Sequence, residues 1–81
     1  MYRLEFRPAA LKALRRLDQR NADRIHAALA LLAHEPRPPA SRKLTGRNAY
    51  RVRVGDYRII YTIDDQGRVV VVVIVGHRRD V

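Results

Sequence analysis

The sequence contains no cysteine, so disulfide bonds and thiolate metal sites are excluded, and a reducing compartment is compatible with the chain. It has no run of about 18 apolar residues, which a membrane-spanning helix would need. Its N-terminus lacks the apolar segment of a secretory signal. The three histidines, His26, His34 and His77, show no ligand spacing. We therefore expect a soluble cytoplasmic protein with no metal, no cofactor and no membrane contact.

Acidic residues are also scarce: 8 Asp and Glu stand against 17 Lys and Arg, giving a net charge of +9. A charge this high opposes compaction, so it favours a polyanionic partner such as nucleic acid. The excess is concentrated between Pro36 and Tyr61, where seven cations accompany a single anion, Asp56. A merely solvated surface is the alternative interpretation of the charge.

The 81 residues predict one domain, 1–81, and 47% hydrophobic residues favour a folded chain over a disordered one. Residues 2–6 alternate apolar and charged side chains, as a half-buried strand does. A first helix is expected from Pro8, and its apolar face would comprise Ala10, Leu11, Ala13, Leu14 and Leu17. A second helix would have Asn21 as its N-cap and end near His34–Glu35, because Pro36 follows.

Residues 36–46 contain three prolines and a glycine, and they predict a basic connecting loop. From residue 50 the period changes to two, which indicates strands at 50–54 and 57–63 joined by a tight turn at Gly55–Asp56. The apolar run 69–75 suggests a central strand covered on both faces. The order β-α-α-β-β-β predicts an α+β fold with a two-helix hairpin packed on one face of a small antiparallel sheet.

The two-residue turn fixes the register of the hairpin, so that Arg53 faces Arg58 and Arg51 faces Ile60. One face then carries the three tyrosines of the hairpin as core, and the other carries Arg51, Arg53 and Arg58. Like charges directly opposite each other cost stability, so we interpret the three arginines as an anion site. Arginine forks bind phosphate with paired donors. Arginines extending from a solvated sheet face are the structural alternative.

The tail Gly76-His77-Arg78 can deliver another cation to this site, but a bulge would exchange the faces of its residues. Histidine is the side chain suited to proton transfer near neutral pH, so His77 is a candidate acid or base, while a histidine at a strand end that points to solvent or to a backbone carbonyl is the favoured alternative.

The motifs Lys43-Leu44-x-Gly46, Tyr50-Arg51-Val52-Arg53-Val54-Gly55-Asp56-Tyr57-Arg58-Ile59-Ile60-Tyr61 and Gly76-His77-Arg78-Arg79 resemble the RelE/ParE toxin superfamily over nearly the whole chain. The resemblance implies a type II toxin–antitoxin module, a cognate acidic antitoxin in a hetero-oligomer and, for the RelE branch, metal-independent mRNA cleavage on the ribosome. It also implies catalytic roles for Arg51, Arg53, Arg58 and Arg78.

Two features depart from the family pattern. The strand cations are often lysine in the family, and arginine stays charged, so it is a poor proton acceptor. The resemblance also implies a C-terminal tyrosine, which the sequence up to Val81 lacks, so we expect the activity to be weakened.

The predicted function is thus a ribosome-dependent mRNA endoribonuclease in which the RNA 2′-OH attacks the adjacent phosphate. In the connecting loop, Arg37, Arg42, Lys43 and Arg47 are expected to contact RNA. The alternatives are a ParE-like inhibitor of DNA gyrase and a non-enzymatic nucleic-acid-binding module.

Overall fold

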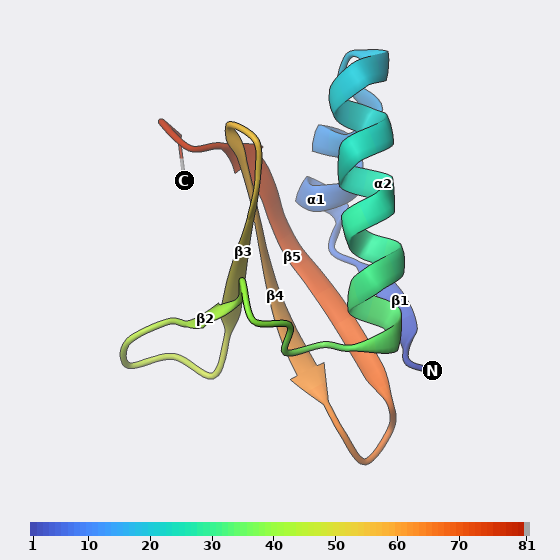
Figure 1. The fold of residues 1–81 in the computed structure, drawn as a ribbon, viewed down its shortest axis with the longest axis vertical. Coiled ribbons are helices and arrows are strands. Elements are labelled where there is room, and N and C mark those ends of the chain that lie inside the picture. Colours follow the sequence, from blue (N-terminus) through green and yellow to red (C-terminus); the bar gives the residue numbers. More distant parts are fainter. Residues whose placement is uncertain (81) are drawn as a thin grey trace.

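The computed structural model describes residues 1–80, and within them two helices and five strands form an α+β domain (Figure 1). The elements in chain order are β1 (Arg3–Phe6), α1 (Pro8–Arg15), α2 (Gln19–His34), β2 (Arg42–Lys43), β3 (Tyr50–Val54), β4 (Tyr57–Asp64) and β5 (Val69–His77). The predicted order is confirmed. The two-residue strand β2 is not expected from the sequence, since residues 36–46 predict only a connecting loop.

The strands lie in the order β1-β5-β4-β3-β2. Three neighbouring pairs are antiparallel, but β1 runs parallel to β5, with Arg3 opposite Val69. The sheet is therefore mixed, and the expectation of an antiparallel sheet is wrong at this edge. No hairpin turn joins β1 to β5, so no local turn sets the direction in which they pair.

Both helices lie on one face of the sheet, as Figure 1 shows, and the core fills the space between the layers. The helices contribute Ala10, Ile25, Leu29 and Leu32, and the strands contribute Val52, Ile59, Tyr61, Val70, Val72 and Val75. The expectation that β5 is covered on both faces is wrong: Val71 and Ile74 are only half-buried, on the face away from the helices. Leu11 also lies outside the core and is 38% exposed.

Asp18 lies in the short link between α1 and α2 and caps the N-terminus of α2. Its side chain accepts a hydrogen bond from the backbone N–H of Asn21, and the Asn21 side chain donates a second bond of 2.7 Å to the same carboxylate. Asp18 is thus the N-cap of α2, and the prediction that Asn21 has this position is corrected by three residues. The predicted end of α2 at His34, before Pro36, is confirmed.

A polar clamp fixes the loop after α2 to the far end of the sheet. Arg37 donates two hydrogen bonds to Asp65, at 3.2 and 3.0 Å, and a third to the Tyr50 hydroxyl. Tyr2 donates to the same Asp65 carboxylate at 2.6 Å. Hydrogen bonds from Arg37 and Tyr2 hold the pKa of Asp65 below its ordinary value. The clamp therefore joins the N-terminus, the loop and the β4–β5 turn.

The tight turn between β3 and β4 lies beside the Arg24 side chain of α2. Gly55 has a φ of 60°, a conformation that favours glycine and suits the first position of a two-residue hairpin turn. A Cβ atom at Gly55 would lie 2.9 Å from the Arg24 guanidinium of α2. The turn thus brings the arginine-bearing strands and the second helix together.

Candidate nucleic-acid interface

The face of the sheet opposite the helices carries a group of arginines. Arg53 and Arg58 are directly opposite each other across β3 and β4, and Arg51 is opposite Ile60, as the sequence predicts. Side chains alternate along a strand, so Arg51, Arg53 and Arg58 share this face while Val52, Ile59 and Tyr61 point into the core. Arg51 and Arg58 are half-buried and Arg53 is exposed. The predicted register and faces are confirmed.

The strand β2 adds a fourth member, because Arg42 is opposite Arg51. We call Arg42, Arg51, Arg53 and Arg58 the arginine cluster. The sequence predicts Arg42 only as a loop contact, since a two-residue strand among prolines has no periodicity to reveal it. The structure instead places it in the same cross-strand row as Arg51.

The electrostatics of the cluster favour an anion. The pKa of Arg51 is held below its ordinary value, first by burial and then by the charges of its neighbours Arg53, Arg58 and Arg42. A hollow of about 360 Å³ opens between the members and is lined by Ala40, Arg42, Arg51 and Arg53. Guanidinium groups crowded around a hollow offer several N–H donors to an oxyanion.

Arg78 directly follows β5 and lies beside the β3–β4 turn. Gly76 is opposite Arg58, and the backbone N–H of Arg78 donates 2.7 Å to the carbonyl of Asp56 in the β3–β4 turn. The Arg78 guanidinium is 3.7 Å from the Asp56 carboxylate, in an ion pair whose side chains are both more than half exposed. An exposed pair of this kind is weak, so an incoming anion can compete for Arg78.

His77 lies on the opposite side of the sheet from the cluster. It is the strand partner of Tyr57, and the two rings meet edge to face with centroids 5.5 Å apart. Its Nδ1 accepts a hydrogen bond of 3.2 Å from the backbone N–H of Arg79. The structure therefore places His77, the candidate acid or base, on the other face of the sheet from Arg58 and outside the candidate site.

A β-bulge explains this separation. Tyr61 is opposite Val72 and Ile60 is opposite Ile74, so Val73 has no partner on β4. Strict alternation from Val70 would place His77 on the arginine face, and the one extra residue reverses that order. The sequence allows for a bulge at the turn after Asp64, but the structure has it inside β5.

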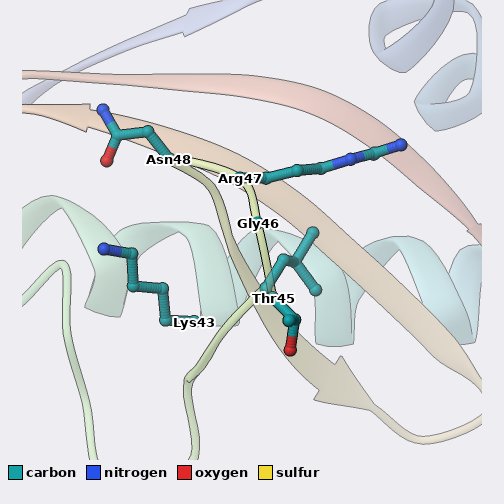
Figure 2. A pocket seen from close by; sticks show the side chains of 6 residues that line it. Lys43, Thr45, Gly46, Arg47 and Asn48 are labelled. Carbon is teal, nitrogen blue, oxygen red and sulfur yellow. The ribbon is translucent and has the colours of Figure 1, made fainter.

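The other loop cations are scattered. Arg37 is engaged in the clamp with Asp65. Lys43 is opposite Tyr50 and so faces away from Arg42, its neighbour on β2. Arg47 lies in the β2–β3 loop, where a hollow of about 610 Å³ is lined by Lys43, Leu44, Thr45, Gly46, Arg47 and Asn48. Figure 2 shows the Lys43 and Arg47 side chains extending in opposite directions from this loop. Only Arg42 of the four joins the cluster.

An apolar groove lies on the other side of β3. It has a volume of about 500 Å³ and is lined mainly by α2, β3 and the loop between them, with Ala27, Leu31 and Val52 among its apolar residues. Leu31 of α2 is 67% exposed and adds to the apolar lining of the groove. Arg24 and Arg53 also line the groove, so it shares Arg53 with the arginine cluster.

Within residues 1–80, no helix is long and apolar enough to cross a membrane. No group of three or more His, Cys, Asp and Glu side chains comes together there as a metal site.

No curated protein matches the chain by sequence. Among solved structures, the chain is similar to one from the intact Escherichia coli RelBE toxin–antitoxin complex, with 31% identity, a TM-score of 0.85 and coverage of 95% of this chain and 96% of that one. It is also similar to the archaeal RelE–RelB complex from Pyrococcus horikoshii, with 30% identity, a TM-score of 0.84 and coverage of 95% and 94%. The RelBE2 complex from Mycobacterium tuberculosis matches with 31% identity, a TM-score of 0.74 and coverage of 95% and 98%.

The sequence model of a family described as the ParE toxin of the type II toxin–antitoxin system parDE matches residues 4–81. The predicted resemblance is confirmed by this match and by the structural matches to RelE. The chain is a type II toxin–antitoxin toxin that belongs to the ParE toxin family and, within the RelE/ParE superfamily, to the RelE-like branch.

Proposed function

We propose that this toxin is an endoribonuclease that cuts messenger RNA on the ribosome, using the arginine cluster to bind and stabilise the reacting phosphate. The observation that carries the proposal is the cross-strand pair of Arg53 and Arg58. Two like charges held opposite each other destabilise the sheet, and a bound phosphate removes this cost. The likeness to RelE toxins supports the same function.

The reaction would be attack of an RNA 2′-oxygen on the adjacent phosphorus. A bond forms between the 2′-oxygen and phosphorus, the bond to the 5′-oxygen breaks, and the products are a 2′,3′-cyclic phosphate and a 5′-hydroxyl. The 2′-OH proton passes to water, and the leaving oxygen takes a proton from water. No electron transfer and no further reactant are needed.

The arginines act on charge and position. Arg58 and Arg78 stabilise the extra negative charge of the five-coordinate phosphate, and Arg53 holds the leaving-group side of the same phosphate. Arg51 binds the RNA backbone and keeps the nucleophile in line. Arginine does not give up its proton, so none of them is a base, but a group of cations lowers the pKa of a nearby hydroxyl.

The partner that controls the toxin would be an acidic antitoxin, since the similar RelE chains were solved in complexes with RelB. The groove between α2 and β3 fits such a partner. Its apolar lining suits an apolar helix face, and Arg24 and Arg53 suit carboxylates beside that face. Because Arg53 also belongs to the cluster, an occupant of the groove would compete with RNA for this side chain.

In vitro translation followed by primer extension tests the enzymatic proposal. We expect the toxin to produce cuts at specific codons of a translated message, and Arg58→Ala to remove them. Intact message together with gyrase-dependent DNA breaks would contradict the proposal and support gyrase inhibition, which the family description ParE favours. Intact message with RNA binding and no DNA breaks would identify a binding module.

A further inference from the structure

The arginine cluster consists of two cross-strand pairs on one face. Arg53 is paired with Arg58 on one side of β3, and Arg51 is paired with Arg42 on the other. The first pair carries the proposed chemistry. The second pair has the same arrangement of opposed like charges, and only its Arg51 member has a role in the proposed reaction, on the RNA backbone.

The spacing of the two pairs suits a repeating anion. Arg51 and Arg53 are two residues apart on β3, so the pairs are offset by about 7 Å along the strand. Six covalent bonds of the sugar–phosphate backbone separate neighbouring phosphorus atoms, so an extended single strand can place adjacent phosphates about this far apart. Two adjacent phosphates of one extended strand therefore match the two pairs.

The hollow beside the second pair provides room for the second phosphate. Arg42, Arg51 and Arg53 line it together with Ala40, so three of its four lining residues are cationic. Arg42 is exposed and Arg51 is half-buried, so a bound phosphate would be held from one side and open to solvent on the other. Arg53 lies between the two positions and can contact both phosphates.

We propose that Arg42 and Arg51 form a second phosphate subsite, which holds the backbone phosphate next to the one bound by Arg53 and Arg58 on single-stranded RNA. The subsite deepens the proposed function and rests on it for the identity of the ligand as RNA. It assigns Arg42, outside the residues that the resemblance to the RelE branch implies, to substrate positioning. The cost of the opposed Arg42–Arg51 charges is relieved when the phosphate binds.

The neighbouring Lys43 offers a matched control. It is on the same two-residue strand, carries the same charge and is exposed, but it points to the other face. Arg42→Ala and Lys43→Ala therefore lower the net charge equally. Only Arg42→Ala removes a member of the proposed subsite.

The experiment uses the full chain and 2′-O-methyl oligouridylates without terminal phosphates, which bind as RNA does but have no nucleophile for cleavage. A dinucleotide, with a single phosphate, is compared with a trinucleotide, with two, by chemical-shift titration. In the wild-type toxin the second phosphate should tighten binding by roughly tenfold, as charge-assisted hydrogen bonds do. Arg42→Ala should lose this gain and Lys43→Ala should keep it.

Two further measurements sharpen the result. With a longer 2′-O-methyl oligomer, Arg42→Ala should reduce the slope of log affinity against log salt by about 0.7, the value for one phosphate contact on a single strand. Arg42→Lys should restore the slope but only part of the affinity, since an ammonium group cannot form the paired contact. Thermal melts of each variant establish that the fold is retained.

Equal effects of Arg42→Ala and Lys43→Ala on the second-phosphate gain would overturn the subsite. So would a variant Arg42→Ala that binds RNA normally but loses affinity for the co-expressed antitoxin, because the ligand of Arg42 would then be a protein carboxylate. The probes cannot be cleaved, so the result does not depend on activity. Loss of the gain in a toxin that leaves messages intact would reject the endoribonuclease and retain the subsite.

Discussion

Arg53 and Arg58 are directly opposite each other across β3 and β4, on the sheet face that the helices leave open. Such a pair has a cost for the free protein, because opposed like charges in neighbouring strands repel. The cost is acceptable where a polyanion is bound. Replacing one arginine of this pair should therefore affect the stability of the fold and the binding of the anion in opposite directions.

Arg53→Thr should keep or raise the thermal stability while it removes RNA cleavage. Threonine favours strands, and loss of the opposed charge would contribute roughly 0.2–1 kcal/mol, which amounts to a few degrees in Tm for a domain of this size. Circular-dichroism melts and the translation assay measure the two effects. Arg3→Thr is the control: Arg3 is also a strand arginine, but it pairs with Glu5 at 2.9 Å. A marked loss of stability in Arg53→Thr would mean that the cluster is structural.

The register of this hairpin is the part of the site that the sequence predicts well. A two-residue turn with glycine in its first position fixes every pairing from Val54–Tyr57 to Tyr50–Tyr61, and alternation then gives the faces. The sequence also predicts both helices, because their apolar residues recur with helical periodicity and Pro36 ends the second one. Leu11 is the exception, since a helix as short as α1 covers only a narrow strip of sheet.

The remaining features depend on contacts between distant segments. The strands β1 and β5 are separated in the chain by both helices, so no local sequence pattern indicates that they pair in parallel. The strand β2 exists because β3 offers it an edge. The position of the bulge within a uniform run of valines has no sequence signal, and this bulge decides the side on which His77 lies.

His77→Asn should leave cleavage within about twofold of the wild type, because His77 packs against Tyr57 on the face opposite Arg58. Asparagine keeps an acceptor near the position of Nδ1 for the Arg79 N–H. Rates measured between about pH 5.5 and 8 should change in parallel for both proteins, since His77 lies outside the site. A rate loss of a hundredfold would return His77 to the reaction.

Tyr61→Phe should lower the free energy of unfolding by about 1–2 kcal/mol. The Tyr61 side chain is fully buried, and its hydroxyl donates a hydrogen bond of 2.7 Å to the carbonyl of Pro36. Phenylalanine keeps the ring and its stacking on Tyr50 but leaves that carbonyl without this donor. Urea denaturation measures the change. The affinity for the 2′-O-methyl oligomer should stay the same, because Tyr61 faces away from the cluster.

Asp65→Asn should weaken the clamp and flatten the acid limb of the stability curve. The folded pKa of Asp65 is lowered by Arg37 and Tyr2, so its contribution is fully present above the unfolded pKa of 3.8 and is lost as the pH falls through the lower folded value. Between about pH 6 and pH 3, the wild type should therefore lose more stability than Asp65→Asn. Equal losses in thermal melts across this range would show that the clamp contributes nothing.

The bulge at Val73 also determines how the chain responds to changes in length. The strand β5 has one residue more than its pairing with β4 requires, and that surplus lies between Val72 and Ile74. Deleting Val73 would relax the local bend and leave both ends of the strand in their present register. An inserted residue could not be accommodated in this way, and it would exchange the faces to which the side chains after it point. Relatives of this toxin should therefore tolerate shortening of the last strand by one residue more readily than lengthening.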